Sequence, residues 1–577
     1  MTNKATTRTR RRAGIVGALF LMALVAIGAQ AVRLHVFKGA WLSERAAREY
    51  ERAMVVQGKR GAIFDRSGNP LAVSIESPSI AAFPRMIADR RAAATQLSRA
   101  LGQPRREVFD KLNPKRSFVW LKRQAIPSQA QAVRTLDLRG IDFITEHSRY
   151  YPSKSLAAQL LGFSGIDGHG LEGLEFQFDN DLKGHEKKIT VLKDALRRRF
   201  EGAGRPPLTE GNNVVLTIDR TIQHIAQKAL EASVSEYGGQ SGIAIVMVPG
   251  TGEVLALAHY PFFNPNSYRD FGRELWRNRA ITDPFEPGST MKIFSVAAAI
   301  DAGICSPSTI FYCENGEYRI GKNVVHDTKS HGWLSLQQIV KFSSNIGSVK
   351  MAEKLGARQL HEYLRRFGFG QRSGIACPGE TAGSLSSFKK WSAIDTGAIS
   401  FGQGVSVSAI QLAAAASAIA NDGVLMKPML VKAITDRKGR TVKTFAPEAV
   451  RRVVSSQTAK TIRRILKTVI SEGGTGTNAA LEGYSVGGKT GTAQKIDESG
   501  TYAKNRYLAS FLGFTPADHP ELTILVLVDE PQGQNYGGIV AAPAFRQIAL
   551  ETLSYLNIPP GTDADRLRVS RDNRADG

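Results

Sequence analysis

The chain is organised around the stretch Glu286-Pro287-Gly288-Ser289-Thr290-Met291-Lys292. Proline and glycine end the preceding segment and a mostly apolar run follows at residues 293–300, which predicts a loop that leads into a largely buried helix. Ser289 and Lys292 stand three residues apart, so their side chains share one face of that helix. Apolar neighbours disfavour the charged form of the lysine, and a general base must be neutral. The stretch therefore predicts a serine nucleophile activated by a lysine base.

The same spacing of serine and lysine recurs at Ser386–Lys389 and Ser387–Lys390. These pairs lie in a polar segment after Glu380-Thr381-Ala382-Gly383, and no buried helix follows them. The context therefore favours Ser289. Its backbone N–H would be one of the unpaired donors of a first helical turn, and hence free to bind an oxyanion.

Length and composition describe a folded protein with more than one domain. The 577 residues exceed one ordinary core, so two or three domains are expected, and contents of 42% hydrophobic and 22% charged residues are typical of folded chains. A formal net charge of +24 could indicate a nucleic-acid-binding protein. We find no nucleic-acid-recognition module in the sequence, however, and the basic residues are scattered except near the N-terminus. We expect no nucleic acid partner, and a basic surface that faces an anionic polymer or a membrane.

The three cysteines, Cys305, Cys313 and Cys377, do not form a disulfide framework. They are interpreted as buried small residues, and the sequence leaves a Cys305–Cys313 disulfide open. No cysteine and histidine stand at metal-ligand spacing, so no metal and no cofactor is expected.

A basic N-terminus precedes a long apolar segment, which runs from Ala13 to about Val32. About 20 apolar residues span a bilayer, whereas the core of a cleavable signal is usually about 7–15 residues long. Ala29-Gln30-Ala31 resembles a signal-peptidase site, so cleavage is the alternative, but the length favours a retained anchor. Because positive charge stays in the cytoplasm, everything after Arg33 should lie outside.

The two halves of the chain differ in pattern. The first half carries a predicted β-hairpin at residues 59–70 and pairs no nucleophile with a base, so it is interpreted as a scaffold. In the second half, predicted strands stand at both ends of a mostly helical region, so strands from both ends should complete one sheet. The predicted strands are 242–248, 253–259, 484–494, 508–515 and 522–529, and the predicted helices include 289–300, 336–352 and 407–420.

A second candidate motif is Ser343-Ser344-Asn345, which follows a helical pattern. Such a tripeptide is commonly a helix cap or a loop. In a functional interpretation, Ser343 would relay a proton between Lys292 and a leaving group, and Asn345 would hold a substrate amide.

A third candidate motif is Gly487-Gly488-Lys489-Thr490-Gly491-Thr492, which lies in a strand pattern. Its glycines would let a substrate backbone approach closely. Lys489 would bind a carboxylate and lower the pKa of Lys292 if adjacent, and the hydroxyls of Thr490 and Thr492 would hold the same carboxylate. The residue pattern also fits a phosphate-binding loop. That interpretation requires a helix after Thr490, but the strand pattern continues there instead.

Taken in order, the three motifs resemble those of the penicillin-binding serine acyltransferases: Ser289-x-x-Lys292, Ser343-x-Asn345 and Lys489-Thr490-Gly491. Three further segments resemble the pedestal domain of the class B enzymes: Arg60-Gly61 with Asp65-Arg66, Arg149 with Tyr151-Pro152, and Gly170–Glu175. Within class B, three segments of this chain resemble the division-specific type, which makes septal peptidoglycan. They are Asp529-Glu530-Pro531, Tyr536-Gly537-Gly538 and Ala541-Ala542-Pro543. One departure is Pro249-Gly250, where many relatives have Asp-Pro; it falls in a predicted turn.

The resemblance implies an α/β (α+β) penicillin-binding transpeptidase fold, with an antiparallel five-stranded sheet flanked by helices and an elongated N-terminal pedestal. The expected parts are a cytoplasmic basic tail at 1–12, a transmembrane anchor at 13–35, a pedestal or dimerisation-like domain at 36–235, a transpeptidase domain at 236–558 and a disordered tail at 559–577.

The activity that the resemblance implies is that of a D,D-transpeptidase. Ser289 would attack the D-Ala–D-Ala bond of a stem peptide, release the last D-Ala and pass the acyl group to an amine of a neighbouring strand. With Ser289, the expected catalytic set includes Lys292, Ser343, Asn345 and Lys489. The oxyanion hole is expected to be formed by the backbone N–H groups of Ser289 and Thr492. The expected substrate-binding residues are Thr490, Gly491 and Thr492. Penicillins would acylate the same serine.

The implied setting is the inner (cytoplasmic) membrane, crossed once, with the catalytic domain in the periplasm. Expected partners are peptidoglycan stem peptides, β-lactams, the membrane, and a division-specific membrane glycosyltransferase with other divisome proteins. Alternatives are a D,D-carboxypeptidase, which uses water as acceptor, a β-lactamase, which needs a deacylating carboxylate, and a non-catalytic penicillin sensor or division scaffold.

Overall fold

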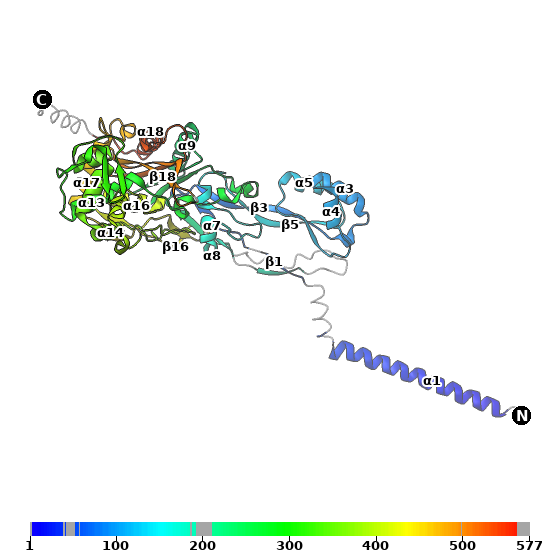
Figure 1. The fold of residues 1–577 in the computed structure, drawn as a ribbon. Coiled ribbons are helices and arrows are strands. Elements are labelled where there is room, and N and C mark those ends of the chain that lie inside the picture. The colour runs from blue at the N-terminus through cyan, green and yellow to red at the C-terminus, as the bar shows by residue number, and fades with distance from the viewer. Residues whose placement is uncertain are drawn as a thin grey trace. The chain divides into compact units, whose positions relative to one another are not determined.

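The computed structural model describes residues 3–38, 41, 52–56, 58–184, 187–191, 210–497 and 499–561. The chain divides into two compact units, one of Met1–Gly58 with Gly184–Thr209 and one of Lys59–Lys183 with Glu210–Gly577 (Figure 1). Most of the tail predicted at 559–577 lies outside the described residues.

The first unit contains the predicted apolar segment as a helix. α1 covers Asn3–Val32, a π-helical turn covers Arg33–Phe37, and β1 (Arg52–Val56) pairs antiparallel with β6 (Lys187–Val191). Arg10–Phe37 is long and apolar enough to cross a membrane, with a mean hydropathy of 2.4 and none of it buried. A helix with these properties suits a membrane anchor, although a signal sequence has the same properties, so retention stays a prediction.

The second unit contains a seven-stranded sheet in which distant parts of the chain meet. Its order is β16-β15-β7-β2-β3-β4, with β5 also paired to β3. The predicted hairpin at 59–70 is confirmed, because β2 and β3 pair across a turn in which the Asp65 carboxylate accepts hydrogen bonds from the Ser67 and Asn69 N–H groups. The strands are β2 (Ile63–Phe64), β3 (Pro70–Ala82), β4 (Val119–Lys122), β5 (Ile141–Tyr150), β7 (Asn213–Leu216), β15 (Val431–Thr435) and β16 (Thr441–Thr444).

Three helices cover one end of this sheet and bury a small core against β3 and β4, built around Ile80, Leu97 and Leu121. α3 is capped by Asp89, whose carboxylate accepts from the Arg91 and Ala92 N–H groups. The helices of the predicted pedestal are α3 (Arg90–Leu101), α4 (Arg105–Lys111), α5 (Pro127–Thr135), α6 (Ala158–Leu161), α7 (Gly173–Gln177) and α8 (Asp179–Leu182).

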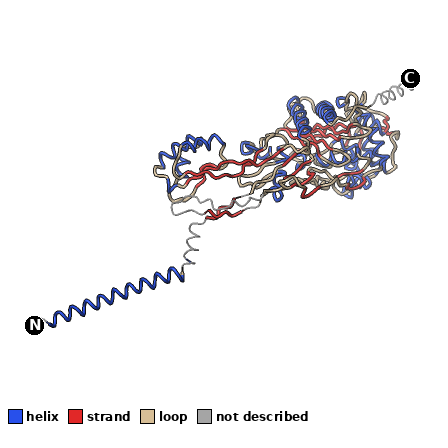
Figure 2. The backbone as a smooth tube through the Cα atoms, turned by 180° about the vertical axis from the view of Figure 1, so that it is seen from behind, coloured by secondary structure: helices blue, strands red, loops and turns tan. Residues whose placement is uncertain are grey.

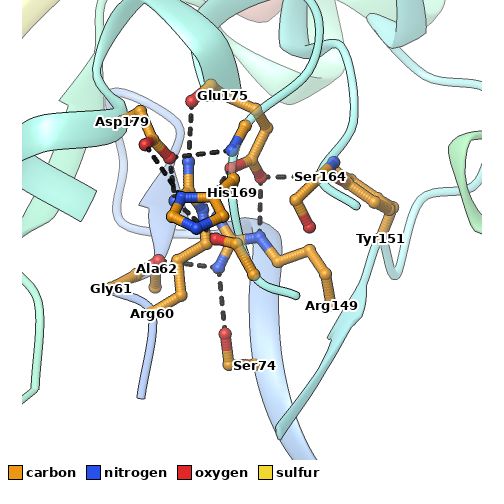
Figure 3. A network of polar contacts seen from close by, with 12 residues as sticks. Arg60, Gly61, Ala62, Ser74, Arg149, Tyr151, Ser164, His169, Glu175 and Asp179 are labelled. Atoms are coloured by element: carbon orange, nitrogen blue, oxygen red, sulfur yellow. Dashed lines mark hydrogen bonds and ion pairs between the residues drawn. The ribbon is translucent and has the colours of Figure 1, made fainter. Parts of the chain in front are cut away.

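A buried network of charged side chains joins the three segments that resemble the class B pedestal (Figure 3). The fully buried carboxylate of Glu175 accepts from Arg60 Nε at 2.7 Å and from Arg149 Nε at 2.6 Å, and Tyr151 Oη donates to it at 3.3 Å. Arg60 also donates to Asp179. Burial alone would raise the pKa of the Glu175 carboxyl, but the two guanidinium groups outweigh it and hold that pKa below its usual value. The network therefore stays charged and connects three segments of the chain.

Replacing Glu175 by glutamine is expected to lower the unfolding free energy of this unit by about 3 kcal/mol, because it leaves a buried guanidinium without its counter-charge. The measurement is thermal or urea unfolding of the full chain in detergent. Glu107→Gln is the matched control, since Glu107 forms an exposed ion pair with Lys111 and should leave the midpoint unchanged. An equal effect of both substitutions would contradict the role given to the network.

The predicted five-stranded antiparallel sheet is confirmed, in the order β18-β19-β20-β8-β9. Figure 2 shows red strands among blue helices in the part of the second unit that ends at the C-terminus. β20 has the predicted bounds, and the other four strands are shifted or extended by a few residues, most of all β19, which starts six residues early. The strands are β8 (Ser241–Met247), β9 (Val254–Tyr260), β18 (Gly487–Ile496), β19 (Tyr502–Thr515) and β20 (Leu522–Asp529).

Side chains alternate between the two faces of this sheet, as strand geometry requires. Ala244 and Val246 of β8 face a core shared with α9 (Arg220–Glu236) and α19 (Ala542–Tyr555). Ile245 belongs to the larger core that contains α11 (Lys292–Asp301) and α16 (Ala409–Ala420). Two helical layers therefore enclose the sheet, in agreement with the prediction.

The helical pattern predicted at 336–352 is broken in the structure. α12 ends at Phe342 and α13 starts at Asn345, because Ser343 adopts a left-handed conformation with φ 63°. The remaining elements are α10 (Arg279–Thr282), β10 (Ile310–Tyr312), β11 (Glu317–Ile320), β12 (Asn323–His326), β13 (Trp333–Ser335), α12 (Leu336–Phe342), α13 (Asn345–Leu355), α14 (Ala357–Arg366), α15 (Ala393–Ser400), β14 (Val424–Met426), β17 (Ala449–Arg452), α17 (Ser456–Ile470) and α18 (Gly537–Val540).

The three cysteines are buried and free. The disulfide between Cys305 and Cys313 that the sequence left open is therefore not formed.

Candidate active site

Ser289 lies in a tight 3₁₀ turn, Gly288–Met291, that leads directly into α11. The prediction of a loop feeding a buried helix is confirmed, with the refinement that the serine stands just before the α-helix and Lys292 at its first residue. Lys292 Nζ lies 3.1 Å from Ser289 Oγ, so the predicted pair is in hydrogen-bond contact.

The amine of Lys292 is fully buried and surrounded by acceptors. It contacts the Ser343 carbonyl oxygen at 2.6 Å, Ser343 Oγ at 3.2 Å and Asn345 Oδ1 at 2.8 Å. Burial lowers the pKa of Lys292 well below its usual value, the charge of Lys489 lowers it further, and the Asp327 carboxylate opposes the shift. A neutral amine at this position is able to accept the proton of Ser289.

Lys489 lies on the other side of Ser343. Its Nζ is 3.0 Å from Ser343 Oγ and also donates to the Thr490 carbonyl oxygen at 3.1 Å. The side chain is fully buried, which lowers the pKa of Lys489 to about 7. The hydroxyl of Ser343 thus stands between two amines with depressed pKa values, where it can pass a proton from one to the other.

Strand β18 passes directly beside the serine turn, and Gly491 allows this approach. A Cβ at Gly491 would lie 2.3 Å from Ser510 Oγ and 3.0 Å from Thr290 Cγ2, so no larger residue fits without movement. A Cβ at Gly288 would lie 3.3 Å from the Thr492 carbonyl oxygen, which puts Thr492 next to Ser289 in space. The structure therefore brings the third motif against the first.

The two threonines that the sequence predicts as carboxylate ligands already have partners in the protein. Thr490 Oγ1 is bonded to Thr475 Oγ1 at 3.0 Å, while Thr492 Oγ1 accepts from the Gly537 N–H at 3.3 Å. A hydroxyl that accepts still has its own proton to donate, so Thr492 can bind a carboxylate without losing its contact with Gly537.

Sequence reasoning missed Asp327, which follows β12. Its carboxylate accepts from Ser344 Oγ at 2.6 Å and from the Asn345 and Ile346 N–H groups, at the start of α13. It therefore offsets the strained backbone of Ser343 by capping the helix that follows. No spacing signal links this residue to the motif, because Asp327 stands 18 residues before Asn345 and only the tertiary fold brings the two together.

Replacing Asp327 by alanine is expected to lower the unfolding free energy by about 2 kcal/mol and the rate of acylation by a fluorescent penicillin by roughly 10- to 100-fold. The physical reason is that three hydrogen bonds which hold the turn of Ser343 would be lost. Glu317→Ala on the neighbouring β11 is the control, because that side chain is 75% exposed. A stable Asp327→Ala protein that acylates at the wild-type rate would contradict the positioning role.

The competing serine–lysine pairs have no comparable geometry. Ser386 Oγ accepts from Trp391 Nε1 at 2.8 Å, and Ser387 precedes a short 3₁₀ turn at Phe388–Lys390 whose residues are not buried. The phosphate-loop interpretation is also wrong, because β18 continues without a break from Gly487 to Ile496 and no helix follows Thr490.

Comparison with known proteins adds independent information. Residues 242–550 match the model of the penicillin-binding protein transpeptidase domain, and residues 55–216 match that of the penicillin-binding protein dimerisation domain. The chain is 35% identical to the probable peptidoglycan D,D-transpeptidase PenA of Neisseria meningitidis, over 90% of this chain and 88% of the relative. It is 33% identical to the peptidoglycan D,D-transpeptidase FtsI of Escherichia coli, over 94% of this chain and 91% of the relative.

A solved structure is similar over most of the chain. The crystal structure of penicillin-binding protein 3 of Mycobacterium tuberculosis, complexed with aztreonam, superposes with a TM-score of 0.70 at 30% identity and covers 88% of this chain and 98% of that one. The similarity therefore includes both the sheet of the site and the N-terminal half of the second unit.

Proposed function

The chain belongs to the class B penicillin-binding proteins, and from that premise we propose that it is the peptidoglycan D,D-transpeptidase that cross-links stem peptides at the division septum through a serine acyl-enzyme. One observation carries the proposal. Ser289, Lys292, Ser343 and Lys489 form a continuous chain of contacts of 3.0–3.2 Å between their side-chain atoms. This chain starts at a nucleophile and ends beside the strand that would hold the substrate.

In the first half of the reaction, neutral Lys292 takes the proton of Ser289, and Oγ attacks the carbonyl carbon of the penultimate D-Ala. The new bond is Oγ–C and the bond that breaks is C–N, with the nitrogen leaving on the terminal D-Ala. That nitrogen needs a proton, which Lys292 returns through Ser343 Oγ with Lys489 on its far side. Backbone N–H groups of Ser289 and Thr492 are proposed to bind the oxyanion.

Substrate orientation follows from the order of groups along β18. Lys489 with the hydroxyls of Thr490 and Thr492 would hold the terminal carboxylate, and Gly491 would leave room for the substrate backbone. Asn345 has its Oδ1 on Lys292, and its Nδ2 donates to the His326 carbonyl oxygen at 3.0 Å, so this amide is held in place for contact with the substrate. In the second half, an amine of a neighbouring strand attacks the acyl carbon and forms the new C–N bond. The C–Oγ bond breaks, and the proton that the amine loses returns through Lys292 to Ser289 Oγ.

The test is an assay of purified full-length protein on lipid-linked precursor in the presence of a glycan polymerase. Release of D-Ala together with cross-linked product is expected. D-Ala release without cross-links would instead identify a D,D-carboxypeptidase, and rapid turnover of penicillin would identify a β-lactamase. Penicillin labelling without either product under these conditions would favour a sensor or scaffold.

The location and the partners are also part of the proposal. The apolar helix and the membership of the family support a membrane-anchored protein. We propose that Ala13–Val32 is retained in the inner membrane with the N-terminus in the cytoplasm, and that it packs against other divisome proteins, the division-specific membrane glycosyltransferase first among them. The domain boundaries at 235/236 and 558/559 stay predictions.

Exchange of residues 13–32 for an unrelated membrane span is expected to keep penicillin labelling but to reduce septal cross-linking in cells, because confinement is kept and specific helix packing is lost. A protein that starts near Ala40 and is exported by a cleavable signal should react with penicillin as well as the full-length protein does. It should support division less well than either membrane-bound form. Normal division by that soluble form would mean that Ala13–Val32 only targets the protein.

A further inference from the structure

A small two-stranded sheet in the second unit has an apolar face that is open to solvent. Its strands β10 and β13 pair antiparallel, with Phe311 opposite Leu334 and Tyr312 opposite Trp333. Because side chains alternate along a strand, these two pairs lie on opposite faces. Phe311 and Leu334 are buried in the large core, whereas Trp333 is 70% exposed and Ile310 is 62% exposed. The outer face of this sheet therefore presents an indole ring to solvent.

The ring of Trp333 has a neighbour that is itself held in place. The ring centroids of Tyr312 and Trp333 are 5.0 Å apart, with an interplanar angle of 44°. Asn315 Nδ2 donates to Tyr312 Oη at 2.9 Å, and Lys350 Nζ lies 5.7 Å from the centroid of the Tyr312 ring. Lys350 is paired in turn with Glu314 at 2.5 Å. Tyr312 thus supports Trp333 from one side, so the platform needs little ordering when a ligand binds.

Aromatic contacts extend from this sheet to the candidate active site. Phe342, which immediately precedes Ser343, is stacked with His331, with centroids 5.3 Å apart, and His331 stands two residues before Trp333. The helix between β13 and Ser343 is α12, whose seven residues span about 10 Å. An extended peptide covers about 10 Å in three residues. A polymer that has a stem peptide in the site is therefore able to reach Trp333 with its backbone.

The size of the apolar face decides what kind of ligand fits it. An aromatic side chain buries about 150–250 Å², so the three side chains of this face, Ile310, Tyr312 and Trp333, offer at most about 500 Å² because each is already partly covered. A stable protein interface needs about 800 Å² on each side. The face is thus too small for a stable protein partner and is of the size of one or two sugar rings.

The chemistry of the face also fits a sugar. The face of an aromatic ring is electronegative, and the C–H groups on one side of a pyranose ring pack flat against it. The hydroxyl and acetamido groups of the sugar then project from its edge, where they need donors and acceptors. The exposed Asn315 and the ion pair of Glu314 with Lys350 lie at the rim and supply both.

We propose that Trp333 and Tyr312 form a sugar-binding platform, which holds an N-acetylhexosamine ring of a peptidoglycan glycan strand beside the candidate active site. Trp333 stacks on the sugar, and Tyr312 supports Trp333. The platform fixes the polymer that has its stem peptide in the site, so that less ordering remains for the peptide itself. The inference rests on the proposed function, to which it adds a binding site for the glycan part of the substrate.

The test measures binding of a peptide-free glycan to the full-length protein in detergent. The probe is the β-1,4-linked tetramer of N-acetylglucosamine, and cellotetraose is the comparison sugar, since it lacks the acetamido groups. Saturation-transfer NMR reports which sugar protons contact the protein, and a titration gives the dissociation constant. The N-acetylglucosamine tetramer is expected to bind more tightly than cellotetraose. Penicillin reactivity, measured in parallel, reports whether each variant keeps a folded active site.

Trp333→Ala is expected to weaken binding of the N-acetylglucosamine tetramer by about 10-fold, the usual effect of losing one aromatic stacking contact. Trp333→Phe should retain most of the affinity, because a flat ring remains. Tyr312→Ala is the second variant and should also weaken binding, since it removes the support of the indole ring. Phe176→Ala is the matched control, because Phe176 is a 56% exposed ring on α7 and should not change the affinity.

A second measurement links the platform to the reaction. It compares the kcat/KM of D-Ala release from a stem peptide that carries its disaccharide with that from the same peptide without sugar. Trp333→Ala is expected to lower the ratio of these two values by about 10-fold, and Trp333→Phe should restore it. A ratio that stays at the wild-type value in Trp333→Ala would overturn the role in substrate binding.

The remaining outcomes separate the platform from the proposed function. A wild-type protein that reacts with penicillin but binds no glycan, or binds both sugars equally, would overturn the platform and leave the enzyme in place. A dimer that dissociates on Trp333→Ala, with no glycan binding, would instead identify the face as a contact between two copies of the chain. Glycan binding without any reaction with penicillin or stem peptide would overturn the proposed function.

Discussion

Replacement of Ser289 by alanine is expected to abolish covalent labelling by a fluorescent penicillin, with the acylation rate falling by roughly 10⁶-fold, the size of effect seen when a serine nucleophile is removed. The reason is geometric. Among the predicted serine–lysine pairs, Ser289 has its hydroxyl 3.1 Å from a fully buried lysine amine. The other hydroxyl of that turn, Thr290 Oγ1, is fully buried and donates to the Pro287 carbonyl oxygen at 2.7 Å.

Ser386→Ala and Ser387→Ala serve as matched controls, because they remove a serine with the same spacing to a lysine from a loop without the buried helix. Both should label at the wild-type rate. The measurement is in-gel fluorescence of native protein over a time course, with mass spectrometry of the acylated peptide. Labelling of the Ser289→Ala protein at a comparable rate would refute the assignment of the nucleophile.

Lys292→Arg is expected to be almost as damaging as Lys292→Ala, although it keeps a positive charge. Arginine does not deprotonate in proteins, so it cannot take the proton of Ser289. The loss expected for removal of the base is about 10⁴-fold or more in the acylation rate. Thermal unfolding separates this loss from misfolding, since both variants should keep the wild-type fold if acylation alone is affected.

The pH dependence gives a second readout for the same residue. The active form carries neutral Lys292, so acylation should increase with pH through the lowered pKa of Lys292 and then level off. Since the charge of Lys489 helps to lower that pKa, Lys489→Gln should move the rising limb to higher pH, in addition to slowing the reaction. A Lys292→Arg protein that acylates at near the wild-type rate would show that Lys292 acts only as a structural cation.

The part of the fold that periodicity determines could be predicted from the sequence. Apolar runs of strand length gave all five strands of the central sheet, and β20 has the predicted bounds of Leu522–Asp529. The pair Ser289 and Lys292 followed from local spacing, which a helical turn converts directly into distance. A pattern that repeats along a helix or strand is therefore sufficient to predict that element and the contacts between residues within it.

Contacts that depend on irregular backbone could not be predicted. The break at Ser343 has no glycine or proline to mark it, and only the tripeptide Ser343-Ser344-Asn345 suggests a cap or loop there. Nothing in the sequence indicates that Asp327, 18 residues before Asn345, supplies the capping carboxylate. In the same way, Arg60, Arg149 and Glu175 were associated only by the resemblance of their segments to a family, since no spacing in the sequence indicates that their side chains meet. The approach of Lys489 to Ser343 likewise depends on tertiary packing.

The seven-stranded sheet has a consequence for how the protein is made. Its strand β7 is held between β2, near the start of the second unit, and β15, which lies more than halfway along the chain. Pairing between such distant strands is slow, because a long loop must close before any contact forms. A chain emerging N-terminus first therefore presents β7 with an open edge until residues 431–435 arrive, and open edges recruit other strands. We expect the nascent protein to need protection from aggregation and proteolysis during this interval, and chains that stop before Val431 to be degraded rather than to accumulate as a folded pedestal.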